Sequence, residues 1–97
     1  MRYIFRIFAV NINKMKFVFS NHALTQMKLR QITKSMVEKI LEKPEQIIKE
    51  NGHKVYQSVV LIEKKKYLIR IFVSHKKSPH VIITVYRTSK INKYYES

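Results

Sequence analysis

The stretch EQIIKENGHKVYQSVVLIE, residues 45–63, decides the fold, because the spacing of apolar residues changes here from helical to alternating. Asn51-Gly52 at its middle is a strong hairpin signal, since both residues tolerate the positive φ angles of a type I′ turn. Strands are therefore predicted at 45–50 and 53–63. Two further apolar runs, at 67–73 and 80–86, are bounded by the turn segments 64–66 and 74–79 and predict two more strands.

The chain before this stretch has helical spacing. Residues 22–31 and 34–43 each carry an apolar stripe, with Ser20 or Asn21 as the first N-cap, Thr33 as the second and Pro44 ending the second helix. A short strand or extended lead-in is predicted at 16–19 and a helical turn within 88–95. The expected fold is α+β, with two N-terminal helices packed on one face of a four-stranded antiparallel β-sheet.

The first fourteen residues are expected to be an accessory N-terminal segment, and residues 15–97 a single α+β domain. Two readings of residues 1–14 stay open: an upstream start extension ahead of Met15, or an added edge strand. Arg6 interrupts the only early apolar run, which is too short for a signal peptide or a membrane span. We therefore expect no membrane partner.

The charge balance points to a polyanion. Twenty Lys and Arg residues against six acidic residues give a formal net charge of +14. A small domain this basic favours nucleic acid as its partner, although a lysine-rich but ordinary surface is the alternative. The chain has no Cys, which fits the cytoplasm and excludes disulfides and thiol chemistry. It also has no Asp, and His75 and His80 are read as solvated turn residues, so neither a metal nor another cofactor is expected.

Strand alternation assigns residues to faces of the sheet. Val81, Ile83 and Val85 are expected to face the helices, with Arg87 at the end of that row. The other face collects Arg70, Phe72, Thr84 and Tyr86. A guanidinium beside hydroxyls and an aromatic ring suits a nucleotide, with its phosphate on the guanidinium and its base on the ring. The alternative is a structural arginine paired with a glutamate.

A second set of polar residues lies on the first helix. His22, Gln26 and Arg30 recur every four residues and span about 80° of the helix. His22 is the side chain best suited to proton transfer near neutral pH. Ser89 and Lys90 follow the last strand, where a lysine is able to hold a phosphate. The alternatives are a solvated helix face and an ordinary basic tail.

Taken in order, FSNHA, the Arg30 to Thr33 segment RQIT, YLIR and TVYRTSK resemble a family of small, basic, uncharacterised bacterial domains. Its pattern is F-S-x-H-A, then R-x-I-[ST], a strand arginine, and T-x-Y-x-[ST]-x-K. Such domains are regarded as members of the barnase–EndoU–colicin–RelE group of metal-independent ribonucleases, many of which are toxins of toxin–antitoxin pairs. The resemblance covers about residues 17–93.

The resemblance implies an enzyme, an mRNA interferase-type RNA endonuclease in which the ribose 2′-OH attacks its own phosphodiester. Acid/base work is assigned to His22, with Tyr86 as the alternative, and Lys90 is placed with them as catalytic. The phosphate-binding set is Arg30, Arg70, Thr84, Arg87 and Ser89. The expected partners are RNA, either free or on the ribosome, and an acidic antitoxin protein.

Two other classes of function stay open at this point. One is a non-catalytic RNA- or DNA-binding module that uses the same basic face, with affinity that falls steeply with salt. The other is a protein-interaction domain that forms a homodimer through an N-terminal edge strand.

Overall fold

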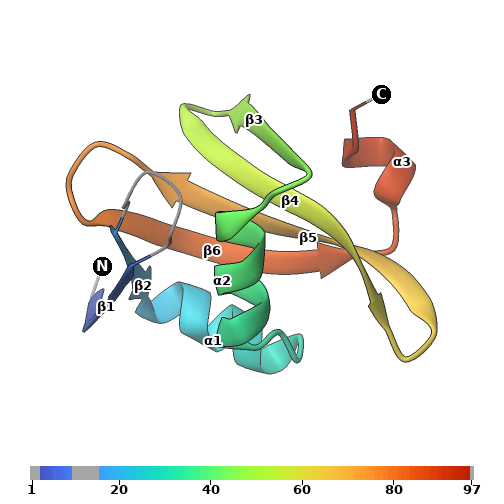
Figure 1. The fold of residues 1–97 in the computed structure, drawn as a ribbon, viewed down its shortest axis with the longest axis horizontal. Coiled ribbons are helices and arrows are strands. Elements are labelled where there is room, and N and C mark those ends of the chain that lie inside the picture. The colour runs from blue at the N-terminus through green and yellow to red at the C-terminus, as the bar shows by residue number, and fades with distance from the viewer. Residues whose placement is uncertain (1–2, 10–15, 97) are drawn as a thin grey trace.

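The computed structural model describes the backbone of residues 3–9 and both backbone and side chains of residues 16–96 (Figure 1). Its elements follow one another in the order β1 (Tyr3–Ala9), β2 (Lys16–Ser20), α1 (Asn21–Leu29), α2 (Lys34–Glu42), β3 (Gln46–Glu50), β4 (His53–Ile62), β5 (Lys65–Ser74), β6 (His80–Thr88) and α3 (Ile91–Tyr94). The α+β class and the order of two helices before four strands agree with the expectation.

The sheet itself differs from the expected four-stranded antiparallel one. Its strand order is β1-β2-β6-β5-β4-β3, and β2 pairs with β6 in parallel, with Val18 opposite Val81. The predicted lead-in at 16–19 is thus a strand that joins the far end of the meander, and β1 adds to it antiparallel. The four-stranded antiparallel prediction is wrong because the parallel partner of β2 lies more than sixty residues later in the chain, beyond two helices and three strands, and local spacing carries no sign of that pairing.

Both helix starts are set by their caps. Ser20 is the N-cap of α1, and its buried hydroxyl accepts a hydrogen bond from the Ala23 amide at 3.0 Å and donates one to the Ile83 carbonyl at 2.8 Å. Thr33 caps α2 in the same way, accepting from the Met36 amide at 3.1 Å. The two predicted caps are confirmed, and the first one also ties α1 to β6.

Two tight turns fix the register of the meander. Asn51 and Gly52 have φ angles of 52° and 78°, as the predicted type I′ turn requires. Glu63 and Lys64, with φ angles of 49° and 66°, make the next turn, so that Lys65 already opens β5. The predicted turn at 64–66 is therefore displaced by one residue. Gln57 consequently lies opposite Arg70 across β4 and β5.

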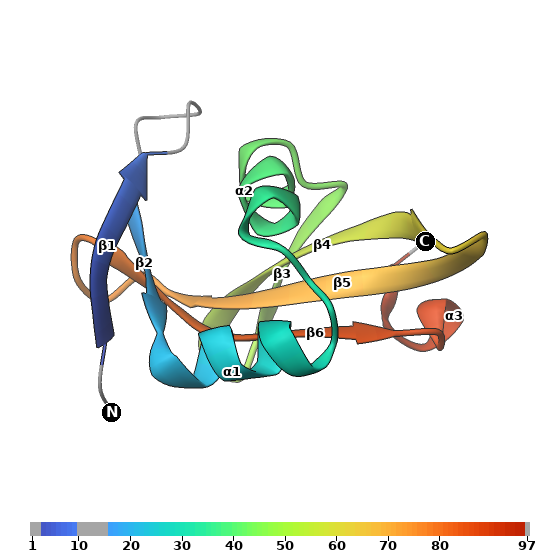
Figure 2. The same cartoon turned by 90° about the horizontal axis from the view of Figure 1, so that it is seen from below.

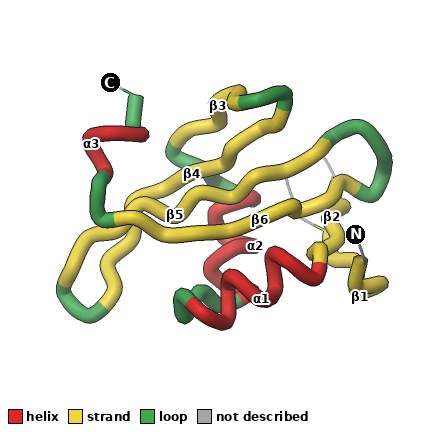
Figure 3. Tube along the Cα trace, turned by 180° about the vertical axis from the view of Figure 1, so that it is seen from behind, coloured by secondary structure: helices red, strands yellow, loops and turns green. Residues whose placement is uncertain are grey.

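One core joins both helices to one face of the sheet. Met27 of α1 and Leu41 of α2 belong to the same buried cluster as Tyr56 and Ile71. In Figure 1, α2 lies in front of β5 and β6, and Figure 3 shows it behind them. We call this side of the sheet the helix face and the other side the far face.

An irregularity in β6 changes the predicted faces. Phe72 pairs with Thr84 but the next residue, Val73, pairs with Ile82, so that Ile83 is the extra residue of a β-bulge. Ile82 and Val85 are consequently the residues that enter the core, whereas Val81 and Ile83 are only half-buried. The expectation that Val81, Ile83 and Val85 share the core face is correct only for Val85.

The ends of the described chain lie far apart. β1 and β2 stand at one end of the molecule, and α3 lies at the other, as Figures 1 and 2 both show. β1 occupies the edge of the sheet, and the rest of the predicted accessory segment, together with Met15, lies outside the described residues. Across residues 3–9 and 16–96, no helix is long and apolar enough to cross a membrane.

Candidate functional site

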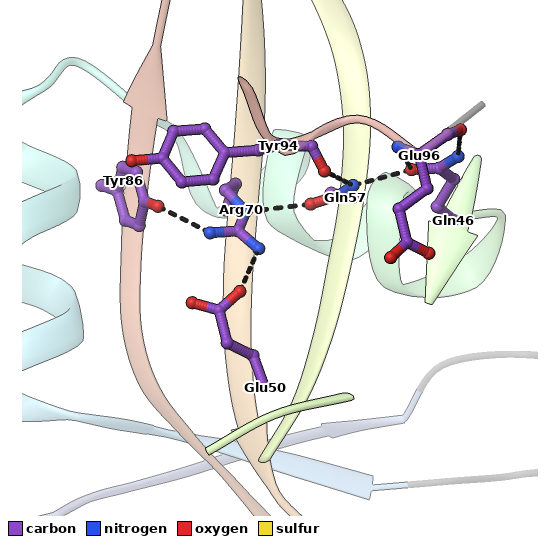
Figure 4. Close-up of polar contacts among 7 residues, drawn as sticks. All are labelled: Gln46, Glu50, Gln57, Arg70, Tyr86, Tyr94 and Glu96. Carbon is purple, nitrogen blue, oxygen red and sulfur yellow. Dashed lines mark hydrogen bonds and ion pairs between the residues drawn. The ribbon is translucent and has the colours of Figure 1, made fainter. Parts of the chain in front are cut away.

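Arg70 is the centre of a polar cluster on the far face. Its side chain is only 1% exposed, although it leaves β5 between the apolar residues Ile69 and Ile71. The guanidinium donates three hydrogen bonds, one from each nitrogen: Nε to Gln57 Oε1 at 2.9 Å, Nη1 to the Tyr86 hydroxyl at 2.8 Å, and Nη2 to Glu50 Oε2 at 2.6 Å (Figure 4). Side chains of the three strands β3, β4 and β6 thus converge on one cation of β5.

The electrostatics keep Arg70 charged. Burial alone would lower its pKa, but the hydrogen bonds and charges of Glu50 and Tyr86 outweigh burial, and the pKa of Arg70 lies above its ordinary value. The Glu50 side chain is 38% exposed and uses only Oε2 for the ion pair. The second carboxylate oxygen of Glu50, Oε1, is therefore available to another hydrogen-bond donor at the surface.

Aromatic rings enclose the guanidinium. Its Cζ lies 4.5 Å from the centre of the Tyr94 ring, 5.2 Å from Phe72 and 5.9 Å from Tyr86. Phe72 and Tyr86 also stack on each other, with ring centres 6.0 Å apart, and Thr84 is the cross-strand partner of Phe72. The predicted grouping of Arg70, Phe72, Thr84 and Tyr86 on one face is confirmed by this register.

Three predicted residues lie near this cluster in the chain but outside it. Ser89 and Lys90 are exposed in the turn after β6, where the Lys90 amide donates to Thr88 Oγ1 at 3.0 Å. Arg87 pairs across the sheet with Ile69, on the helix face, and its guanidinium lies 4.5 Å from the Tyr67 ring centre. Arg87 is thus separated from Arg70 by the sheet.

The helix residues lie elsewhere. His22 is exposed in the first turn of α1, which begins beside β2, at the end of the molecule away from α3 (Figure 2). Arg30 is exposed at the C-cap of α1 and donates to Gln26 Oε1 at 3.3 Å. Because α1 packs on the helix face through Ala23 and Met27, the structure does not bring His22 or Arg30 to Arg70.

The alternative of an arginine paired with a glutamate is confirmed by the Arg70–Glu50 ion pair. Glu50 was not identified as that glutamate from the sequence, and Gln57 was missed, although a signal for both exists. The Asn51-Gly52 turn sets Glu50 opposite His53 and Gln46 opposite Gln57. Counting from the turn at 63–64 then sets Gln57 opposite Arg70. The registers of two tight turns therefore suffice to place these polar residues on the face of Arg70.

A second cluster lies at the β5–β6 connection. His75 Nε2 is 3.2 Å from the Tyr56 hydroxyl, and the His75 and His80 ring centres are 4.0 Å apart. Both histidines are half-buried, so their prediction as solvated turn residues is wrong. Burial, with His80 and Lys54 nearby, lowers the pKa of His75 to about 4, which keeps this imidazole neutral at pH 7. Burial also raises the pKa of Tyr56.

Of the two clusters, the one at Arg70 has the groups for acid/base chemistry on an anion. A carboxylate, a cation and a phenol lie in one hydrogen-bonded line, and the carboxylate reaches the surface. Such a line is able to accept a proton, neutralise a developing charge and donate a proton.

Comparison with known proteins gives a family but no characterised relative. No curated protein and no solved structure matches the chain. One family model, described as a domain of unknown function, matches residues 19–87, which include Glu50, Gln57, Arg70 and Tyr86 but not Ser89, Lys90 or α3. Since the match spans more than half of the 97 residues, the chain belongs to this family, the domain of unknown function DUF4258.

Proposed function

We propose that the protein is a metal-independent RNA endonuclease whose active site is the Arg70 cluster. The observation that carries the proposal is that one guanidinium hydrogen-bonds a carboxylate on one side and a phenol on the other, Glu50 at 2.6 Å and Tyr86 at 2.8 Å. Cleavage of RNA by its own 2′-OH needs a proton acceptor, a proton donor and positive charge on the phosphate. The three side chains supply one of each.

The proposed reaction begins at the ribose 2′-OH next to the scissile phosphate. Glu50 takes the proton of the ribose 2′-OH as its oxygen attacks the adjacent phosphorus. Arg70 stabilises the negative charge that develops on the phosphoryl oxygens. The bond from phosphorus to the 5′-oxygen breaks, and Tyr86 donates its proton to that leaving oxygen. The products are a 2′,3′-cyclic phosphate and a 5′-hydroxyl.

This assignment moves the acid/base work from His22 to Glu50 and Tyr86. The reason is geometric, because α1, which carries His22 in its first turn, begins at β2 and packs on the helix face through Ala23 and Met27. Lys90 and Lys93 lie in the chain between Tyr86 and Tyr94 and are exposed. Their proposed role is to attract the RNA backbone, which is also the role expected of a net charge of +14.

A toxin is the biological role that we propose for this activity. It rests on the resemblance of the motifs to the ribonuclease toxin group and on the charge of the chain. The partner would be an acidic antitoxin that complements +14, and the site of action would be the cytoplasm, where the RNA is.

The test is cleavage of a labelled mixed-sequence RNA in EDTA by the wild type, Glu50→Gln and Tyr86→Phe. Both variants keep the size of the side chain, and each is expected to lower the cleavage rate at least a hundredfold. Glu63→Gln, in an exposed turn, and Tyr67→Phe, on the other face, are matched controls and should cleave like the wild type. Unchanged rates in the first two variants would refute the assignment, provided that all variants melt cooperatively.

A non-catalytic RNA-binding module is the second candidate. It is favoured by the 1% exposure of Arg70 and its ion pair with Glu50, since a phosphate cannot reach an arginine in that state. In this case, RNA should bind with a steep salt dependence, no 2′,3′-cyclic phosphate should form, and Glu50→Gln should leave binding unchanged.

A further inference from the structure

The C-terminal segment covers the far face at Arg70. We call residues 91–96, that is α3 and the two residues after it, the C-terminal strap. The Tyr94 ring lies over the guanidinium at 4.5 Å, and Figure 4 shows Tyr94 and Glu96 beside the polar cluster. With the strap in place, Arg70 is 1% exposed. The Arg70 guanidinium, which must contact the phosphate in the proposed reaction, is therefore shielded from it.

Two glutamines hold the strap. Gln57 is fully buried, and its Oε1 must face Arg70 because the Arg70 Nε group can only donate. Its Nε2 is thereby directed to Gln46 Oε1 at 2.7 Å and to the Tyr94 carbonyl at 3.2 Å.

Gln46 continues the chain of bonds to the end of the strap. Its Oε1 accepts from the Glu96 amide at 3.0 Å, and its Nε2 donates to the Glu96 carbonyl. Arg70, Gln57, Gln46 and the strap are thus one hydrogen-bonded network, so the position of the strap and the orientation of Arg70 depend on each other.

Beyond the two glutamines, the strap is anchored by the Tyr94 ring on Arg70 and by a side-chain hydrogen bond between Tyr95 and Glu45, and neither tyrosine is buried. None of the residues of α3 is buried, and Asn92, Lys93 and Glu96 are exposed. Its helix is a single turn, which has little stability of its own. Segments with few buried apolar contacts and exposed hydrogen bonds open at low cost relative to global unfolding. The strap therefore has the properties of a cover that can leave while the sheet stays folded.

We propose that the C-terminal strap is an autoinhibitory cover of the Arg70 site and that RNA displaces it. This inference rests on the proposed function for the identity of the ligand. In the closed state, the Tyr94 ring occupies the place of the RNA against the guanidinium. Lys90 and Lys93, which precede and belong to the strap, attract the phosphate backbone to the point where the cover opens. The family match ends before the strap, at residue 87.

The test uses the full chain and Gln46→Glu. This substitution keeps the oxygen that accepts from Gln57 and the Glu96 amide, but it sets a carboxylate oxygen against the Glu96 carbonyl in place of a donor. Loss of that bond should raise the open population about fivefold. Hydrogen exchange of the Arg70 Nε–H, followed by NMR, reports the opening directly. Asn92→Ala, an exposed change within α3, is the control and should exchange like the wild type.

The second arm adds a mixed-sequence 2′-O-methyl RNA, which cannot attack its own phosphodiester. Its binding to the wild type should raise exchange of the Glu96 amide, because the strap has left Gln46. Unchanged exchange of Arg70 in Gln46→Glu would overturn the proposal, as would RNA bound with the Glu96 amide still protected.

Cleavage assays on the same variants separate the strap from the proposed function. Faster Arg70 exchange together with about fivefold faster cleavage in Gln46→Glu supports both. Faster exchange and strap release by RNA, with no cleavage by any variant, supports the cover and overturns the nuclease.

Discussion

Replacing Arg70 by methionine is the sharpest test of the polar cluster as a stabilising unit. Methionine keeps most of the aliphatic stem but removes all three donors. Gln57, which is fully buried, is then left with an unpaired Oε1, and a buried unsatisfied acceptor costs about 1–3 kcal/mol. Loss of the Glu50 bond adds about 1 kcal/mol, discounted because Glu50 is 38% exposed and can be hydrated.

The expected loss in the free energy of unfolding is therefore about 3 kcal/mol, or about 15 °C in Tm for a domain of this size. Equilibrium urea denaturation measures it. Arg87→Met is the control, because Arg87 is half-buried and its described contact is with the Tyr67 ring, which is worth about 1 kcal/mol or less.

A double variant checks the cause. Adding Gln57→Leu to Arg70→Met removes the orphaned acceptor but also the two bonds that Gln57 Nε2 donates, so the second change should cost at least about 1 kcal/mol less than Gln57→Leu alone in the wild type. A loss no larger in Arg70→Met than in Arg87→Met would refute the reasoning, because the buried network would then contribute nothing measurable.

Two further predictions concern the cap of α1 and the histidine cluster. Ser20→Ala should lower the free energy of unfolding by about 2–3 kcal/mol, since it removes the cap of α1 and leaves the Ile83 carbonyl without its donor. Thr33→Ala, at an exposed cap, should lower it by only about 1 kcal/mol. Equal losses in urea denaturation would contradict this. The pKa of His75 is lowered from its ordinary 6.5 to about 4 in the folded protein. Between these two pH values the unfolded state binds more protons than the folded state, so the free energy of unfolding should fall as the pH drops from 6.5 to about 4. His75→Gln, which leaves His80 in place, should lessen that fall between pH 7 and 4.5, and an equal fall would contradict the cause.

Local signals in the sequence predicted most of the elements. Ser20 and Thr33 begin helices as expected, and Asn51-Gly52 turns as expected. Each of these depends on a few neighbouring residues, because caps and tight turns are satisfied within the segment itself. The grouping of Arg70 with Tyr86 also follows from alternation along two adjacent strands.

The failures have a common physical origin in long-range pairing. The parallel partner of β2 lies more than sixty residues away, and Phe17 to Phe19 carry no local sign of it. The bulge at Ile83 responds to packing of Ile82 and Val85 into the core, which alternation cannot anticipate. The separation of His22 from Arg70 depends on which face α1 covers, and helical periodicity gives no information about that choice.

The parallel pairing of β2 with β6 has a consequence for the order of folding. The hairpins from β3 to β6 join residues that are close in the chain, so their loops close early and at low entropic cost. β2 is made before any of them, yet its parallel partner, residues 80–82, is made more than sixty residues later. On a translating ribosome, β2 has β1 as an early neighbour, but it must wait for its parallel partner until the hairpins from β3 to β6 have emerged. Mutations in β2, such as at Val18, should consequently change the rate of unfolding more than the rate of folding.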